Sequence, residues 1–258
     1  MKLSPRLKAI ASMVSSGSKV ADIGTDHAYI PIYLVKSEII PFAIAMDIND
    51  GPLEIAKENI REARCLDVID IRKSDGIKSL VSGEVDSVVI AGMGGNLIKS
   101  ILLGNMQVLR SLKECIIQPQ SEMKMLRSFL VNNGFVFVKE DAVKDDGKYY
   151  FIMKVVLGRE REKESNKWSQ EELSFGKILL RNKNEVLKEY LMQEKHVRDI
   201  ILANLEYELI KLANFNYSNV SDYEYVECTN KIDKISKRKA ELHLELDTIK
   251  GGLSFYDM

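Results

Sequence analysis

The chain has 258 residues, 45% of them hydrophobic and 29% charged, and this composition excludes a disordered or fibrous protein. Its net charge of −1 excludes a general attraction to polyanions, so a nucleic-acid contact requires a local basic surface. The sequence has no apolar run of the roughly 20 residues that a bilayer requires, no signal-peptide core and no cysteine pair at metal-ligand spacing. We therefore expect a cytoplasmic protein with no metal and no membrane contact.

Strands and helices alternate through the first half of the chain. Ser4 followed by Pro5 predicts a helix start, and an amphipathic helix is expected from there to about Val14. Five short apolar strands are then predicted at residues 19–23, 42–46, 67–72, 86–91 and 114–118. The predicted helices are residues 28–37, 53–64, 95–103 and 121–133. Such repeated strand–helix units predict right-handed crossovers and a doubly wound parallel sheet.

Residues 135–143 and 148–157 differ from the preceding strands. They are alternating apolar runs joined directly by Lys-Asp-Asp-Gly, which is a turn sequence, and they predict an antiparallel hairpin. A parallel sheet that ends in such a hairpin is typical of class I methyltransferases. The predicted fold class is therefore α/β, with a Rossmann-like class I methyltransferase sheet.

The polar run after Gly158 predicts a boundary between a domain of residues 1–158 and a helical domain of residues 159–258. Residues 170–212 are compatible with a helix throughout. A stripe with alternating steps of three and four residues follows, at Ile232, Ile235, Lys239, Leu242, Leu246 and Ile249. Together these patterns predict an antiparallel coiled-coil helical hairpin with a loop at residues 214–229. Trp168 is expected to anchor this tail to the sheet domain.

The first strand runs into Asp22-Ile-Gly-Thr-Asp-His, where Gly24 permits a tight turn and the close approach of a nucleotide-type ligand. A dinucleotide-binding fingerprint requires glycine at the positions of Asp26 and Tyr29. A carboxylate at position 26 repels a diphosphate, which disfavours NAD. It suits the sulfonium cation of S-adenosyl-L-methionine, and that molecule is the predicted cofactor.

Acidic residues and glycines also follow the next strands, at the rim where open α/β sheets bind ligands. Asp47 is predicted to accept hydrogen bonds from ribose hydroxyls, and Asp75 from an adenine amino group. Each aspartate alone is equally explained as a helix cap, so the prediction depends on the set. The fourth strand ends in Ala91-Gly-Met-Gly-Gly95, which leaves backbone free of side chains for a methyl acceptor. The amides of Gln118 and Gln120 are expected beside this opening, either for base edges or as a polar turn.

These motifs, with Asp47-Ile-Asn-Asp-Gly-Pro and Asp146-Gly-Lys-Tyr, resemble the bacterial TrmK-type tRNA adenine-N1 methyltransferases over residues 3–157. The resemblance implies methylation of N1 of adenine 22 in tRNA, with Asp26 as the catalytic carboxylate and a helical second domain. Gln120 departs from the pattern of the family. His27 is the alternative proton-handling residue. We expect a monomer with tRNA as its partner.

The predicted site residues fall into two groups. The cofactor-binding group is Asp22, Gly24, His27, Asp47, Ile48, Asp75, Gly76, Gly92 and Met93. The substrate-binding group is Arg6, Lys8, Tyr29, Gly94, Gly95, Gln118, Pro119 and Gln120.

Further candidates for RNA contact are the basic residues of the first and last helices and the tyrosines of the predicted loop. They are Lys2, Arg6, Lys8, Lys231, Lys234, Lys237, Arg238, Tyr217, Tyr223 and Tyr225. Two alternatives stay open. One is an S-adenosylmethionine-dependent methyltransferase for another RNA, a protein or a small molecule, and the other is a non-catalytic coiled-coil interaction protein.

Overall fold

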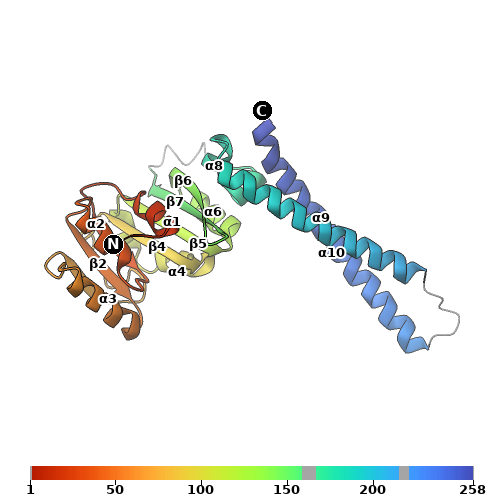
Figure 1. Ribbon diagram of the computed structural model, residues 1–258, viewed down its shortest axis with the longest axis horizontal. Helices are drawn as coiled ribbons and strands as arrows, with labels where there is room; N and C mark the ends of the chain where they lie inside the picture. The colour runs from red at the N-terminus through yellow and green to blue at the C-terminus, as the bar shows by residue number, and fades with distance from the viewer. Residues whose placement is uncertain (1, 159–166, 215–220, 258) are drawn as a thin grey trace. The chain divides into compact units, whose positions relative to one another are not determined.

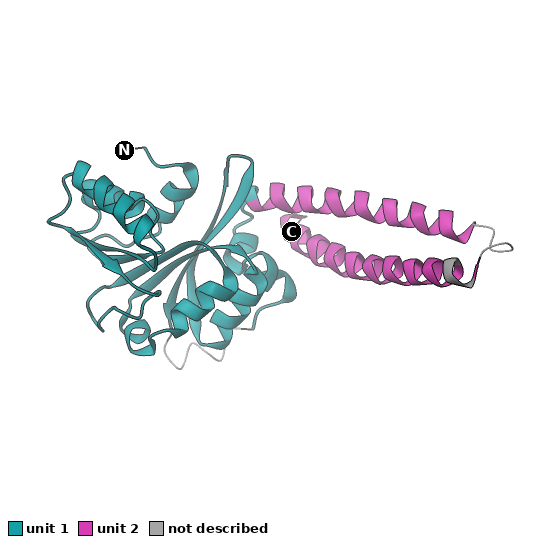
Figure 2. Cartoon of the chain, turned by 90° about the horizontal axis from the view of Figure 1, so that it is seen from below, with its two compact units in different colours: residues 1–186 teal, residues 187–258 magenta. Residues whose placement is uncertain are grey.

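The computed structural model of the chain describes residues 2–158, 167–214 and 221–257. The chain forms two compact units, Met1–Val186 and Leu187–Met258 (Figure 2). The first unit is built on a sheet, and the second consists of two long helices. The sequence predicted a domain boundary after residue 158. This is a statement about which segments fold independently, and it stays a prediction.

A seven-stranded sheet organises the first unit (Figure 1). Its strands are β1 (Lys19–Ile23), β2 (Phe42–Asp47), β3 (Ile69–Lys73), β4 (Ser87–Gly94), β5 (Glu114–Ser121), β6 (Phe135–Asp145) and β7 (Lys148–Leu157). Their spatial order is β3-β2-β1-β4-β5-β7-β6, and β7 is antiparallel to both of its neighbours. The predicted parallel strands and the predicted hairpin are all present, which confirms the α/β class I methyltransferase-type sheet.

Helices cover both faces of the sheet. In this unit they are α1 (Pro5–Ala11), α2 (Tyr29–Lys36), α3 (Asp50–Glu62), α4 (Gly95–Leu103), α5 (Met106–Ser111), α6 (Met123–Asn132), α7 (Gln170–Phe175) and α8 (Lys177–Arg181). Helices α4, α5 and α6 pack with Met46 and Ile90, whereas α1, α2 and α3 pack with Ala45 and Val89 on the other side. These four strand residues are fully buried, because successive strand residues point to opposite faces and both faces are covered.

The strand order places the most favourable ligand position beside β1 and β4. These strands are parallel neighbours in the middle of the sheet, and the chain winds away from them in opposite directions. Strand β4 continues to Gly94 with register irregularities after Ala91, and β5 continues to Ser121. Gly92, Gly94, Pro119 and Gln120 therefore lie in the ends of strands, beyond the predicted strand limits at Ala91 and Gln118, whereas Gly95 begins α4 as predicted.

A buried ion pair attaches α7 and α8 to the sheet. Arg127 Nε of α6 donates to Glu140 Oε1 of β6 at 3.0 Å, and both side chains are almost completely buried. Arg127 Nη1 also donates to the carbonyl of Ser174, and Glu140 Oε2 accepts from the N–H of Ile178. Trp168 packs against Phe137 of β6 at a ring distance of 4.6 Å, consistent with the predicted anchoring role.

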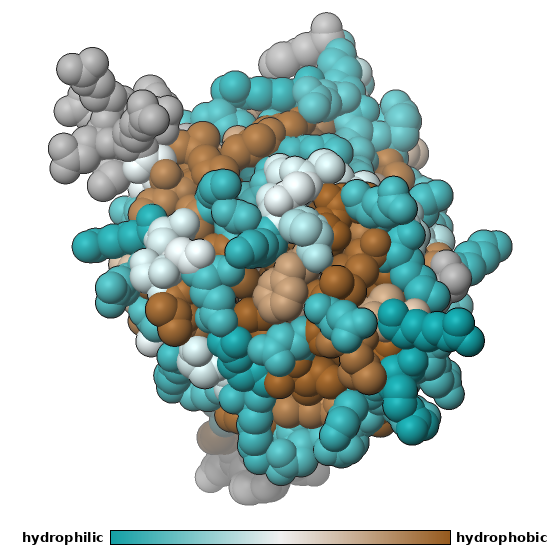
Figure 3. Space-filling view, turned by 90° about the vertical axis from the view of Figure 1, so that its left-hand side faces the viewer, coloured by the Kyte–Doolittle hydropathy of each residue, from teal (hydrophilic) through white to brown (hydrophobic). Residues whose placement is uncertain are grey.

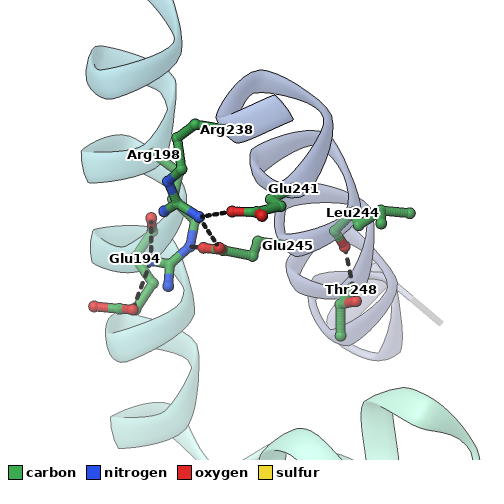
Figure 4. A network of polar contacts seen from close by, with 7 residues as sticks. All are labelled: Glu194, Arg198, Arg238, Glu241, Leu244, Glu245 and Thr248. Atoms are coloured by element: carbon green, nitrogen blue, oxygen red, sulfur yellow. Dashed lines mark hydrogen bonds and ion pairs between the residues drawn. The ribbon is translucent and has the colours of Figure 1, made fainter. Parts of the chain in front are cut away.

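The second unit is an antiparallel pair made of α9 (Glu185–Ala213) and α10 (Asp222–Asp257). Its buried side chains are Leu187 and Leu191 of α9 and Ile235, Leu242, Leu246 and Ile249 of α10. Arg198 of α9 binds Glu245 of α10 across the pair at 2.7 Å, and Arg238 binds the same carboxylate within α10 at 2.8 Å (Figure 4). The two packed helices confirm the predicted helical hairpin.

Two details of the helical prediction are wrong. The predicted helix over residues 170–212 is interrupted, because Gly176 has a φ of +100° and Lys183 has a φ of +49°. The predicted loop at residues 214–229 is shorter, since α10 begins at Asp222 and includes Tyr223 and Tyr225. Tyr217 lies outside the described residues.

Exposed apolar side chains of the first unit include Tyr29, Ile48, Ile55 and Leu66. On the face drawn in Figure 3, apolar surface is interrupted by hydrophilic side chains.

Among the described helices, none combines the length and hydrophobicity needed to cross a bilayer. In the same part of the chain, no three His, Cys, Asp or Glu residues cluster as a metal site would require.

Candidate active site

A cavity of about 500 Å³ lies at the carboxyl ends of β1 and β4. Eight of the predicted site residues line it: Arg6, Asp22, Gly24, Asp26, His27, Tyr29, Gly92 and Gln120. The remaining lining residues include Thr25, Asp145, Asp146 and Tyr150. The structure therefore brings together the loop after β1, the end of β4 and the turn between β6 and β7.

The loop after β1 begins with a turn that only glycine adopts easily. Gly24 has a φ of +75°, and its N–H donates to the carbonyl of Met46 at the end of β2. A Cβ atom at this position would lie 2.0 Å from Cε of Met93, the side chain that covers Gly24 from β4. Glycine at position 24 therefore keeps the ends of three neighbouring strands close together.

Asp22 is a buried carboxylate at the base of the cavity. It is 7% exposed, and burial raises its pKa to about 6, although the neighbouring Thr25 side chain opposes the shift. No lysine or arginine among the described residues forms an ion pair with it. A buried carboxylate without a cationic partner is costly when it is ionised, so a positively charged ligand in this cavity would be stabilised beside it.

Asp26 and His27 lie at the mouth of the same cavity. The Asp26 side chain is 75% exposed, and its Oδ2 is 3.1 Å from Nε2 of His27. The imidazole stacks on the ring of Tyr29 at 4.9 Å, and the carbonyl of His27 accepts a hydrogen bond from Asn59. His27 is thus held from two sides, and it can orient the more exposed carboxylate of Asp26.

Another part of the cavity lining carries a cation. Arg6 reaches in from α1, and its guanidinium lies 5.0 Å from the centre of the Tyr150 ring. The Ser4 hydroxyl lowers the pKa of Asp145, and the backbone N–H of Arg6, which donates to the same carboxylate, lowers it further. The cavity therefore has an acidic wall formed by Asp22 and the loop after β1, and a second wall, called the basic wall, where Arg6 supplies a cation beside Asp145.

The predicted cofactor residues of the second and third strands lie outside this cavity, at the neighbouring end of the sheet. Asp47 Oδ1 accepts from the N–H of Asn49 at 2.7 Å, and its carbonyl accepts from Ser74, which holds these two strand ends together. Asp75 forms an ion pair with Lys78. Ile48 is 55% exposed, and Gly76 packs against Ile101 of α4.

The other predicted substrate residues also lie beyond the cavity lining. Gln118 is fully buried, and Pro119 lines a second cavity of about 370 Å³, to which Gln120 also contributes. Gly94 and Gly95 pack against Ser121 and Glu122 at the start of α4, and Lys8 is exposed on α1.

Sequence reasoning assigned no role to Tyr150, Asp145 or Asp146. The motif Asp146-Gly-Lys-Tyr was visible as a feature of the turn, but no local signal connected it with the loop after β1. The antiparallel pairing of Asp145 with Lys148 and of Val143 with Tyr150 places this turn beside the cavity. Only the strand order makes these residues part of the site.

Known proteins are similar to this chain over most of its length. Residues 3–153 match a family described as a methyltransferase domain. The tRNA (adenine(22)-N(1))-methyltransferase of Bacillus subtilis is 32% identical over 201 residues, covering 78% of this chain and 84% of that protein. The crystal structure of the B. subtilis m1A22 tRNA methyltransferase TrmK has 26% identity and a TM-score of 0.72, covering 98% of this chain and 99% of that one. M. capricolum TrmK in complex with S-adenosyl-homocysteine has 28% identity and a TM-score of 0.65, covering 96% of this chain and all of that one.

Proposed function

Because the chain belongs to the TrmK-type family of class I S-adenosylmethionine-dependent methyltransferases, we propose that it methylates N1 of adenine 22 in tRNA. The observation that carries this proposal is the extent of the similarity. The B. subtilis relative named for this activity matches 201 residues, which is more than the generic methyltransferase match at residues 3–153.

The residues around the first strand fit S-adenosyl-L-methionine. When bound, this molecule supplies an electrophilic methyl group on a sulfonium cation. Asp22, whose pKa is raised to about 6 by burial, gains a favourable interaction with a positively charged ligand. The diphosphate of a dinucleotide would lack this interaction and would meet the carboxylates of both Asp22 and Asp26. Asp47 and Asp75, at the ends of the next strands, are proposed to bind the ribose and adenine of the cofactor.

Asp26 is the proposed catalytic residue. N1 of adenine carries a lone pair at neutral pH, so no proton has to be removed before it attacks. The methylated ring is cationic, and positive charge therefore develops on the base during transfer. A carboxylate oriented by His27 at 3.1 Å can stabilise that charge, an effect worth about 3 kcal/mol for one well-placed group.

The substrate base must leave its stack to enter the cavity, because N1 is on the pairing edge of adenine. Tyr29, Gly92 and Gln120 line the space that would receive it. The exposed Lys2 and Lys8 of the N-terminal segment are proposed to contact the RNA backbone.

The basic residues of the second unit are not equivalent as RNA contacts. Lys231 pairs with Glu208, and Arg238 pairs with Glu241 and Glu245. Lys234 and Lys237 are exposed and form no ion pair with another described residue. These two lysines are therefore the stronger candidates for phosphate contact in this unit.

The test is to incubate the protein with labelled S-adenosyl-L-methionine and unmodified tRNA transcripts, and to locate the product by primer extension. The proposal expects one stop directly before the modified nucleotide 22 and no labelling of a transcript with guanine at that position. Labelling of another nucleotide, or of no tRNA, would reject adenine 22 as the target. Size measurement on the same sample would check the predicted monomer.

A further inference from the structure

Arg6 is held at the basic wall of the cavity by three elements of the sheet. Its Nε donates to Oε1 of Gln118 on β5 at 2.8 Å, and its guanidinium lies over the ring of Tyr150 on β7. A Cβ atom at Gly92 of β4 would lie 2.8 Å from Nη2 of Arg6, so the guanidinium rests directly on the backbone there. The planar group therefore has a defined position and orientation.

Gln118 of β5 determines the orientation of the Arg6 guanidinium. Its side chain is fully buried, and its Nε2 donates to the carbonyl of Pro119 at 2.7 Å. This bond leaves Oε1 facing Arg6 and defines which end of the amide is the acceptor. Gln118 therefore acts through Arg6, and its burial keeps it from contacting a substrate base directly.

The two terminal nitrogens of Arg6 remain available. Among the described residues, neither Nη1 nor Nη2 makes a hydrogen bond, and no carboxylate forms an ion pair with the guanidinium. Asp145, the nearest acidic partner, accepts from the backbone N–H of Arg6 instead. A half-buried cation in a cavity, with its fork of donors unused, is a receptor for a planar pair of acceptor oxygens.

We propose that Arg6 binds an oxyanion, namely a phosphate of the RNA next to the target nucleotide, and that Gln118 is its positioning residue. This inference rests on the proposed function. The ring of Tyr150 supports the guanidinium from one side, which leaves the edge with Nη1 and Nη2 for the ligand.

The position of Arg6 favours RNA over the cofactor as the source of the oxyanion. Its contacts are with β4, β5 and β7, which β1 separates from β2 and β3 in the strand order. The second cavity of about 370 Å³ adjoins this place, because Gln120 and Tyr150 line both cavities. Lys148 and Tyr149 also line the second cavity, so a neighbouring nucleotide would find a cation and aromatic surface there.

The charge of the product favours a phosphate over a base edge. Methylation at N1 makes the base cationic, and a bare guanidinium aimed at that base would oppose the reaction. A phosphate neutralises Arg6 and leaves the developing charge to Asp26. The two charged walls of the cavity then have separate ligands.

The experiment compares Arg6→Met, Arg6→Lys and Gln118→Met with Lys57→Met, which removes one exposed lysine of α3. For each variant, tRNA binding, its salt dependence, KM and kcat are measured, and calorimetry gives the affinity for S-adenosyl-L-methionine. Arg6→Met is expected to weaken tRNA binding and raise KM by about tenfold to hundredfold, with kcat and cofactor affinity close to wild type. The slope of log affinity against log salt should fall by about one. Lys57→Met should match wild type in every measurement.

Gln118→Met separates positioning from folding. It is expected to raise the KM for tRNA less than Arg6→Met does, and to add little in an Arg6→Met background, because both changes remove the same oriented fork. Arg6→Lys keeps the charge but loses the fork and should recover only part of the binding. The double variant removes both Gln118 Oε1 and its Arg6 donor, so neither is left without its partner, and only the carbonyl of Pro119 loses a donor. Unchanged thermal melting and cofactor affinity in the double variant would confirm an intact fold.

Two results would overturn the inference. Unchanged tRNA binding in Arg6→Met would show that Arg6 does not bind an RNA phosphate. If cofactor affinity is lost at the same time, the carboxylate of the cofactor is the oxyanion that Arg6 binds. Additive effects of Arg6→Met and Gln118→Met would show that Gln118 does not act through Arg6, which would reject its positioning role. If wild-type protein modifies a nucleotide other than adenine 22, the proposed function fails, but the same variants still test Arg6 on the RNA that is bound.

Discussion

The two walls of the cavity are built in different ways. The acidic wall comes from one short segment, in which Asp22 lies near the end of β1 and Gly24 and Asp26 follow that strand directly. The basic wall comes from α1, β5 and β7, which contribute Arg6, Gln118 and Tyr150 from distant parts of the sequence. The comparison shows that a charged loop can be recognised from local sequence, whereas a charge held by packing requires the assembled sheet.

The largest effect is expected from Asp26→Asn, which keeps the shape of the acidic wall and removes its exposed charge. Turnover should fall by roughly 100-fold to 1,000-fold, because charge on the base is no longer stabilised in the transition state. The dissociation constant for S-adenosyl-L-methionine, measured by calorimetry, should stay near the wild-type value. An equal loss of cofactor affinity would place Asp26 among the cofactor ligands and not at the acceptor.

Asp22→Asn should separate stability from binding within the same wall. Burial raises the pKa of Asp22 in the folded protein to about 6 from its ordinary value of 3.8, so its stabilising contribution is present below about pH 4 and is lost as pH rises through 6. The ligand-free variant should therefore be more stable than wild type at pH 7, by on the order of 3 kcal/mol. Cofactor affinity should fall in the variant.

Urea unfolding of both proteins at pH 4 and pH 7 checks the sign of this effect. The stability difference should be small at pH 4 and should reach its plateau above pH 6. Wild-type cofactor affinity should weaken below about pH 6, where Asp22 takes up a proton. A variant less stable than wild type at pH 7 would contradict the assignment of Asp22 as an unpaired buried charge.

The smallest of these effects is expected from Asp47→Ala at the neighbouring strand end. Loss of the ribose contact should weaken binding of S-adenosyl-L-methionine about tenfold and leave the turnover number at saturating cofactor nearly unchanged. Asp70→Ala, which removes an exposed aspartate of β3, is the matched control. If turnover in Asp47→Ala falls as far as in Asp26→Asn, Asp47 is not only a cofactor ligand, and the separate roles proposed for the two aspartates are wrong.

Local patterns predicted most of the sheet. Residues 19–23 were predicted as a strand and form β1, because an apolar run flanked by polar residues has few alternatives in a short segment. The break at Gly176 was missed. That glycine has a positive φ, and Glu140 Oε1 would lie 2.6 Å from a Cβ at this position. The break therefore depends on a residue of β6, which is distant in the sequence. The early start of α10 at Asp222 was also missed, because residues 222–229 lack a strong apolar stripe.

The sequence by itself determined the alternation of strands and helices, the antiparallel hairpin, the long helical pair and the acidic loop after β1. Each of these depends on periodicity or on neighbouring residues, which a linear sequence contains. Only the tertiary structure decided that Arg6, Gln118 and Tyr150 meet, and that Asp145 holds the start of α1. Those contacts depend on strand order and register, which bring together side chains more than 100 residues apart.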